Sequence, residues 1–243
     1  MKIRIKFRKY GTMKFIGHLD VMRYFQKAIR RADVDVCYSG GFSPHQIMSF
    51  AAPLGVGNTS NGEYVDIEVS STKDSETMKK CLNGVMSEGF EVVSYRGLPD
   101  DAANAMSIVG AGDYTLAFRP GYEPEDMDKE TWFQGLIAFF ERPSVMVTKK
   151  TKRGEKEMDL KPLVYELRIC PEGDGEMEGP RLFMKISAGS AANVKPEQVL
   201  DAYYGFLGKE RPPFAFMVQR EEVYADRASD AEKEAGIHSF ISL

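Results

Sequence analysis

The N-terminal segment changes from a strand pattern to a helix pattern. Residues 2–10 alternate apolar and basic side chains, and a period of two with one apolar face predicts a half-buried strand. From residue 16 to residue 32 the apolar positions recur every three or four residues, the stripe of an amphipathic helix. The strand's apolar residues are Ile3, Ile5 and Phe7, and its basic residues are Arg4, Lys6 and Arg8.

Further periodic runs complete the first half of the chain. A glycine-rich loop over residues 38–45 leads into an apolar run over residues 47–54, and we expect strands there and at residues 64–69. Ser75 can cap a helix that ends at Gly89, and a last strand follows. The predicted order is β-α-β-β-α-β, that of a ferredoxin-like unit.

The second half repeats this order with one strand more than needed. A helix that follows Asp128 ends before Pro143, and another opens with Pro196 and ends at Gly208. We therefore predict an α+β fold of tandem ferredoxin-like (βαββαβ) halves with antiparallel sheets, and an extra hairpin in the second half. The strands of this half are expected at residues 114–118, 144–148, 163–169, 181–186 and 214–224.

The turn-rich stretch between the halves sets the expected domain boundaries. We expect an N-terminal domain over residues 1–98, a linker over 99–112 and a C-terminal domain over 113–226. A tail over residues 227–243 is rich in Ala and charge, which suits a short helix or disorder.

Composition points to a soluble protein. Apolar residues make up 43% of the 243 residues, enough for a core, and no apolar run approaches the ~20 residues of a membrane helix. The N-terminus lacks the apolar region of a signal peptide, so we expect a cytoplasmic protein without a membrane partner. The three cysteines are widely spaced, which argues against a disulfide framework and a structural zinc site.

Basic residues are concentrated near the N-terminus. Residues 1–50 hold 10 Lys or Arg against 3 Asp or Glu, whereas the remainder holds 22 against 33. Such a local field attracts phosphates or an acidic protein surface. The alternative is an ordinary solvated face.

A second basic run predicts a hairpin tip that contacts a phosphate backbone or keeps an edge soluble. Its residues are Lys149, Lys150, Lys152, Arg153 and Lys156.

Two histidines and a carboxylate are the candidates for catalysis. His18 and Asp20 stand at the start of the first helix, and His45 ends a loop that the crossover between strands brings back toward that point. Imidazoles can transfer protons near neutral pH. In the alternative, His18 caps the helix, Asp20 pairs with Arg23 and His45 hydrogen-bonds within its loop, which leaves a binding role open.

The loop around Gly40 and Gly41 has two interpretations. Its backbone N–H groups could hold an anion, or the glycines could serve a turn with positive φ. The aromatic residues around Trp132 are expected in the core, with a docking patch as the alternative. The predicted substrate- or RNA-binding surface comprises Arg4, Lys6, Lys14, His18, Arg23, Arg30, Arg31, Ser39, Gly41, Phe42 and His45.

The first strand carries Arg4, Phe7 and Lys9 before Gly11, and residues 14–69 carry the triplet His18-Leu19-Asp20 and the loop Tyr38-Ser39-Gly40-Gly41-Phe42-Ser43-Pro44-His45. With these motifs the chain resembles the N-terminal signature of the radical-SAM-linked domain of unknown function. One departure is Gly17, where a Ser is common in the family. Members are found fused to radical SAM proteins or encoded beside them, often near genes for ribonuclease G and ribosomal proteins. The matching residues are Arg4, Phe7, Lys9, Gly11, His18, Leu19, Asp20, Arg30, Arg31, Ala32, Tyr38, Ser39, Gly41, Phe42, Pro44, His45, Ser60 and Glu63.

The resemblance implies an accessory protein rather than a radical SAM enzyme, because the chain has no loop with three cysteines. Our leading hypothesis is a non-catalytic module that binds RNA or a ribosome-related substrate and presents it to a radical SAM partner. That partner, not this chain, would hold the iron–sulfur cluster and S-adenosylmethionine. One alternative is a metal-independent RNA-cleaving or phosphoryl-handling enzyme that uses His18 and His45, and another is a protein–protein scaffold without nucleic acid.

Overall fold

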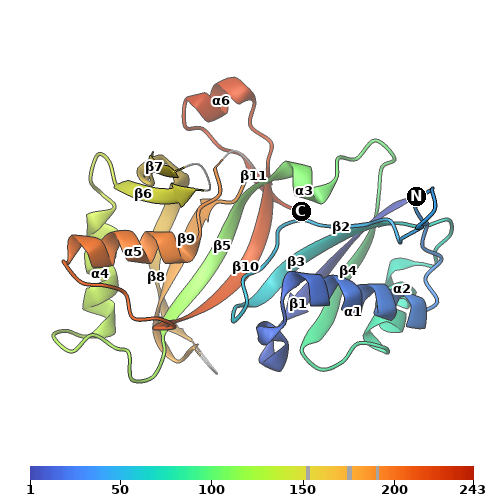
Figure 1. The fold of residues 1–243 in the computed structure, drawn as a ribbon, viewed down its shortest axis with the longest axis horizontal. Helices are drawn as coiled ribbons and strands as arrows, with labels where there is room; N and C mark the ends of the chain where they lie inside the picture. Colours follow the sequence, from blue (N-terminus) through green and yellow to red (C-terminus); the bar gives the residue numbers. More distant parts are fainter. Residues whose placement is uncertain (152–153, 174–176, 190–191) are drawn as a thin grey trace. The chain divides into compact units, whose positions relative to one another are not determined.

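The protein forms two compact α+β units. A computed structural model describes residues 1–151, 154–173, 177–189 and 192–243 (Figure 1). The strands pair mostly in antiparallel fashion within each unit, as predicted for an α+β chain with antiparallel sheets. Unit 1 consists of Met1–Val109, Arg220–Asp226 and Ile241–Leu243, and unit 2 of Gly110–Gln219 and Arg227–Phe240.

Unit 1 follows the predicted order of elements. Its strands hydrogen-bond in the order β4-β1-β3-β10, and β2 also pairs with β3. The elements are β1 (Lys2–Lys9), the 3-10 helix η1 (Gly11–Phe15), α1 (His18–Arg31), β2 (Met48–Phe50), β3 (Thr59–Glu68), α2 (Ser75–Asn83), β4 (Phe90–Leu98), α3 (Ala105–Ile108), the second part of β10 (Phe216–Asp226) and the end of β11 (Phe240–Ser242).

The alternation in β1 builds the core of unit 1. Ile3, Ile5 and Phe7 are buried and belong to one cluster with the apolar stripe of α1. The Phe7 and Phe25 rings lie 4.4 Å apart between their centroids. Because side chains alternate along β1 and Ile3, Ile5 and Phe7 face α1, Arg4 and Lys6 point to the opposite face of the sheet.

Unit 2 contains an extra hairpin, β6 and β7, which is two strands more than a strict repeat needs, where the sequence predicted one. Its main strands are ordered β10-β5-β9-β8, while β6 and β7 form a separate two-stranded ladder. The elements are β5 (Val109–Phe118), α4 (Lys129–Phe139), β6 (Met146–Thr151), β7 (Gly154–Asp159), the 3-10 helix η2 (Lys161–Leu163), β8 (Val164–Gly173), β9 (Gly179–Ser187), α5 (Pro196–Phe206), the first part of β10 and α6 (Asp230–Glu234).

The aromatic helix of unit 2 is a core element. Trp132 and Phe133 of α4 are buried against Phe118, and the Trp132 ring meets the Tyr203 ring of α5 at 4.9 Å between centroids. These contacts confirm the core interpretation of the aromatic residues around Trp132.

Several element ends differ from prediction. The residue that caps α2 is Asp74 rather than Ser75, because the Asp74 carboxylate accepts hydrogen bonds from the backbone N–H and the hydroxyl of Thr77. The same helix ends before Gly84, not at Gly89. The strand expected over residues 47–54 shortens to β2, and the chain then bends toward Gly55.

The segments expected to lie outside the domains contain regular structure. Residues 99–112 include α3 and the start of β5, and residues 227–243 include α6 and β11. Within the described part of the chain, no helix is both long and apolar enough to cross a membrane.

Candidate nucleic-acid interface

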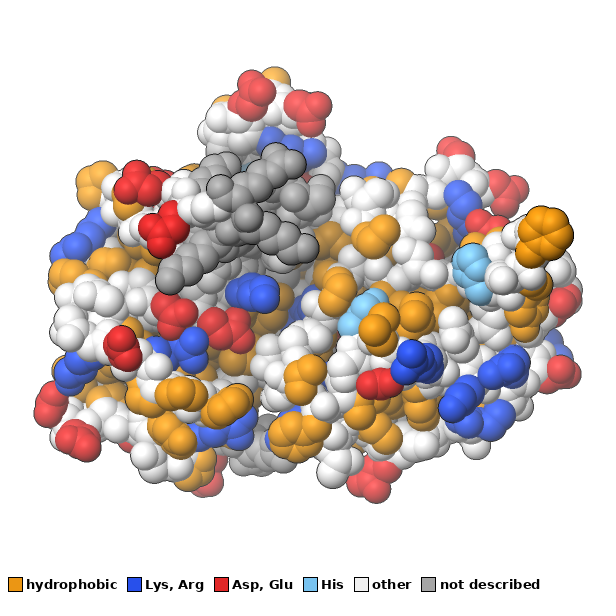
Figure 2. Space-filling model, viewed as in Figure 1, with side chains coloured by type: hydrophobic (Ala, Val, Ile, Leu, Met, Phe, Trp, Pro, Cys, Tyr) orange, Lys and Arg blue, Asp and Glu red, His pale blue; other side chains and the backbone are white. Residues whose placement is uncertain are grey.

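The outer face of α1 carries a stripe of exposed cations. Arg23, Lys27, Arg30 and Arg31 are exposed, and Figure 2 shows Lys and Arg side chains gathered over this helix. Arg23 lies 3.3 Å from Asp20, and Arg31 donates to the Val85 carbonyl. Among the described residues, neither Lys27 nor Arg30 has a carboxylate within ion-pair distance. These two cations are therefore available to an anionic ligand.

The basic residues of β1 do not join this stripe. Arg4 is buried and binds the Asp66 carboxylate through two hydrogen bonds of 2.7 and 2.9 Å. Lys6 lies 2.6 Å from Glu222. Both side chains are on the sheet face opposite α1, because Ile3 and Ile5 occupy the face that α1 covers. The prediction of one continuous surface of strand and helix is wrong, because side chains alternate between the two faces of a strand.

The loop over residues 38–45 is closed by its own hydrogen bonds. The Ser39 hydroxyl lies 2.9 Å from Nδ1 of His45 and accepts from the His45 backbone N–H at 3.1 Å. Gly41 has φ of +98°, a value that favours glycine, and this matches the turn interpretation. The loop leaves the Phe42 side chain fully exposed and Tyr38 half exposed, so it presents aromatic rings to solvent.

The two histidines belong to segments that meet α1 at different points. His18 is the first residue of the helix, and its ring meets the Phe50 ring edge-on at 5.3 Å between centroids. His45 is followed by Gln46, whose amide donates to the Gln26 carbonyl in the middle of α1. At 1.5 Å per residue, residues 18 and 26 are separated by about 12 Å along the helix.

Each candidate catalytic residue has a contact of its own in this structure. Asp20 contacts Arg23, and His45 contacts Ser39, as the non-catalytic alternative expects. His18 does not cap α1, because the capping residue is Gly17 and no side chain supplies a cap. Lys14 lies beside Phe15, with its ammonium 5.6 Å from the ring centroid.

A buried cluster of charges is the feature that sequence reasoning missed. Lys9, Glu63 and Arg220 are all within 5% exposure, and Arg220 Nε lies 3.0 Å from a Glu63 carboxylate oxygen. Lys9 donates to the Ile16 carbonyl at 3.0 Å. Burial raises the pKa of Glu63 and lowers the pKa of Lys9.

A cavity of about 10 Å³ adjoins this cluster and is bordered by Lys9, His18 and Glu63. That volume suits a single water and excludes a larger ligand. The buried Ser60 hydroxyl accepts from the Gly62 backbone N–H at 3.1 Å, and its presence beside Glu63 partly offsets the rise in the pKa of that carboxyl. Lys9, His18, Ser60 and Glu63 belong to the motif quoted above, but nothing in the sequence links them to Arg220. We interpret the cluster as a structural tie, since it has no room for substrate.

Residues 2–196 match the model of a family described as an uncharacterized protein conserved in bacteria, DUF2344. The chain belongs to this family. No curated protein matches it. The match includes α1 and the loop of unit 1 and ends at the first residue of α5, so Arg220 lies outside the matched region of this DUF2344 protein. The family description states no activity, and the link to radical SAM proteins stays a prediction.

No group of three or more His, Cys, Asp or Glu side chains is arranged to hold a metal ion among the described residues. Cys37, Cys81 and Cys170 form no disulfide. Within the second basic run, Lys152 and Arg153 lie outside the described residues, and so do the side chains of Lys149, Lys150 and Lys156.

Proposed function

We propose that this protein is a non-catalytic accessory module that binds RNA through the exposed cationic face of α1. The observation that carries the proposal is the pair Lys27 and Arg30, exposed and without a carboxylate partner in the described part of the chain. With Arg23 they occupy positions i, i+4 and i+7, which share one face of a helix. These positions span about 10 Å, enough to contact successive phosphates of one strand.

The glycine loop supplies a second type of contact. Phe42 and Tyr38 present exposed rings, and the hydrogen bond from Gln46 to Gln26 anchors the loop beside α1. Exposed aromatic rings next to cations suit single-stranded RNA, because unpaired bases stack on the rings while the cations bind phosphates. Ser39, Gly41 and His45 shape this loop and would act by positioning Phe42.

We further propose that each unit is a ferredoxin-like domain, so that the chain carries two in tandem. The order β1-α1-β2-β3-α2-β4 of unit 1 supports this, and so does the order β5-α4-β8-β9-α5-β10 of unit 2 once the β6–β7 hairpin is taken as an insertion. Sheets of this kind recur among RNA-binding domains, which is an analogy of fold alone.

The partner that receives the RNA is proposed to be a radical SAM protein. This part of the proposal rests on the resemblance of residues 14–69 to the radical-SAM-linked family. The partner would supply the iron–sulfur cluster and S-adenosylmethionine, and this chain would supply the RNA or a ribosome-related substrate.

The test is binding of a short single-stranded RNA of mixed sequence to the whole protein over a series of salt concentrations. Replacing both Lys27 and Arg30 by Glu should weaken RNA binding at least ~10-fold. The number of counterions released on binding, obtained from the slope of log affinity against log salt concentration, should fall by about two. Arg31 is left unchanged because it bonds the Val85 carbonyl. The matched control is Lys209→Glu, an exposed lysine of unit 2 that is paired with Asp126.

The outcomes separate the functions. Equal loss in the Lys209→Glu control, or no salt-dependent binding at all, contradicts the proposal. RNA cleavage that survives a chelator and disappears in His18→Ala would favour the enzyme alternative. Capture of a radical SAM protein from the native cell after ribonuclease treatment, with no RNA binding by the purified chain, would favour the scaffold.

A further inference from the structure

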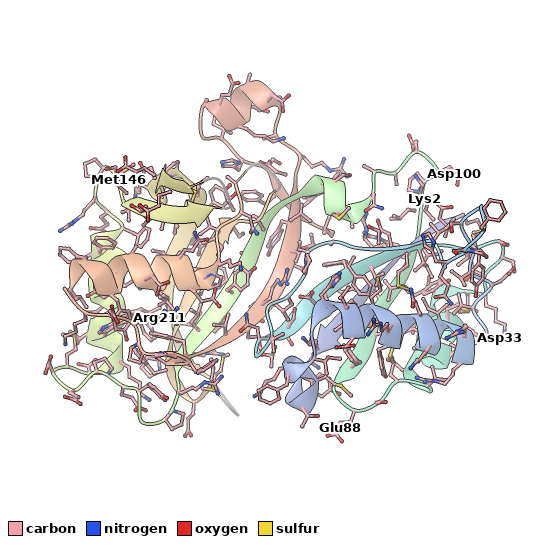
Figure 3. The ribbon with its side chains drawn as sticks, viewed as in Figure 1. Lys2, Asp33, Glu88, Asp100, Met146 and Arg211 are labelled. Carbon is pink, nitrogen blue, oxygen red and sulfur yellow. The ribbon has the colours of Figure 1, made fainter. Side chains whose placement is uncertain are left out.

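Unit 2 contains a groove that the proposed RNA surface does not use. Its volume is about 550 Å³, and it lies between β6, the end of α4 and α5. Figure 3 labels Met146, the first residue of β6, on this part of the unit. Its lining includes Arg142, Met146, Val147, Thr148, Asp201 and Phe206.

One edge of the groove is the backbone edge of β6. Leu160 donates to the Val145 carbonyl at 2.9 Å, and Val147 faces Met158 in the antiparallel register of β6 and β7. In an antiparallel ladder the hydrogen-bonding direction alternates, so the N–H and C=O groups of Met146 and Thr148 point away from β7. Among the described residues these outward groups have no hydrogen-bond partner.

The groove combines apolar surface with one uncompensated cation. Met146 is 56% exposed and Phe206 is 50% exposed, although both are large apolar residues. The Arg142 guanidinium stacks on Phe206, 4.1 Å from the ring centroid, and has no carboxylate partner in the described part of the chain. The Asp201 carboxylate, by contrast, binds Arg211 at 2.6 Å. The charge left over in the groove is therefore positive.

We propose that this groove binds an extended acidic segment of a partner protein, which adds to β6 as a further strand. An unpaired strand edge offers donors and acceptors at the spacing of another peptide backbone. Apolar side chains of the added strand would pack against Val147 and Phe206, and its carboxylates would pair with Arg142. A nucleic acid matches the cation but not the alternating backbone groups of Met146 and Thr148.

The experiment uses the whole protein and a blocked peptide that alternates Val and Glu. We expect saturable binding, with slower hydrogen exchange at the Met146 and Thr148 amides. Two further peptides carry N-methyl groups on alternate amides: the amides of the Val residues in one peptide and the amides of the Glu residues in the other. Strand addition requires that only one of these two peptides loses binding, because only one set of amides points toward β6. This comparison needs no variant of the protein.

Variants of the protein locate the site. Thr148→Pro removes one outward N–H and should weaken binding ~10-fold, whereas Thr148→Ala keeps the N–H and should bind like the parent. Arg142→Gln should weaken binding of the Val-Glu peptide but not binding of a Val-Gln peptide. The proposal is overturned if the Val-Glu peptide does not bind, if both methylated peptides bind equally, or if a Val-Lys peptide binds as well. None of these results depends on whether α1 binds RNA.

Discussion

At the scale of single residues, Gly62 shows how closely two strands approach each other within unit 1. A Cβ at this position would come within 2.6 Å of the Glu221 carbonyl oxygen and 2.9 Å of the Glu222 Cα. Both neighbours are backbone atoms of β10 and cannot rotate away. Gly97 in β4 is the contrasting case, since nothing lies within 4 Å of a Cβ placed there.

We therefore expect Gly62→Ala to destabilise the protein by about 1–3 kcal/mol, the usual cost of overpacking. Gly97→Ala should leave the free energy of unfolding within about 0.5 kcal/mol of the parent. Urea unfolding followed by circular dichroism measures both. Equal effects of the two substitutions would show that the approach of β10 to β3 is not as tight as described.

At the same scale, the alternation along β1 separates Arg4 and Lys6 from the cations of α1. Alternation places Arg4 and Lys6 opposite Ile3 and Ile5, and α1 must cover the apolar face. That separation from the α1 cations was deducible from sequence. Their partners Asp66 and Glu222 were not, because they come from other strands.

At the scale of an element, the start of α4 depends on a carboxylate cap. The Asp128 carboxylate accepts from the Thr131 backbone N–H at 2.8 Å and from its hydroxyl at 2.7 Å. These hydrogen bonds lower the pKa of Asp128 below its usual value. A carboxyl whose pKa is lowered by folding stabilises the folded state at pH values above the pKa that it has in the unfolded chain. This stabilisation is lost as the pH falls through the pKa of the carboxyl in the folded state.

Asp128→Ala should therefore lower the melting temperature at neutral pH, because α4 carries the buried Trp132 and Phe133. The gap between parent and variant should narrow as the pH is taken below about 3.9, the pKa of an unfolded aspartate. Thermal unfolding over a pH series measures it. Asp126→Ala, which removes a solvent-exposed partner of Lys209, is the control and should show a smaller gap at every pH.

At the scale of the whole molecule, the second part of β10 supplies ion-pair partners for charged residues near the start of the chain. Arg220 and Glu222 come from near the end of the chain, yet they contact Glu63 and Lys6. Within the buried cluster, Glu63 is the anion that faces two cations, Lys9 and Arg220. Removing Glu63 leaves two buried positive charges, whereas removing Arg220 leaves Glu63 with Lys9.

We expect Glu63→Gln to cost about 3–5 kcal/mol of stability and Arg220→Met to cost less. The double variant should be more stable than Glu63→Gln alone, because it keeps only one buried cation. Arg8→Ala, which breaks the exposed pair with Glu91, is the control and should cost less than about 1 kcal/mol. Chemical denaturation of the four variants tests the order, and an Arg220→Met variant that is the least stable would refute it.

The local features of this protein follow from its sequence alone: the strand β1, the helix α1, the Asp128 cap of α4, the start of α5 at Pro196, and the cationic stripe from Arg23 to Arg31. These depend on periodicity and on neighbours within a few residues. Three other features appear only in the folded chain: Arg4 and Lys6 are neutralised, the His18 ring lies against Phe50, and Arg220 reaches Glu63. Ion pairs, burial and the pairing of distant strands depend on which segments the fold brings together, and no local pattern encodes that.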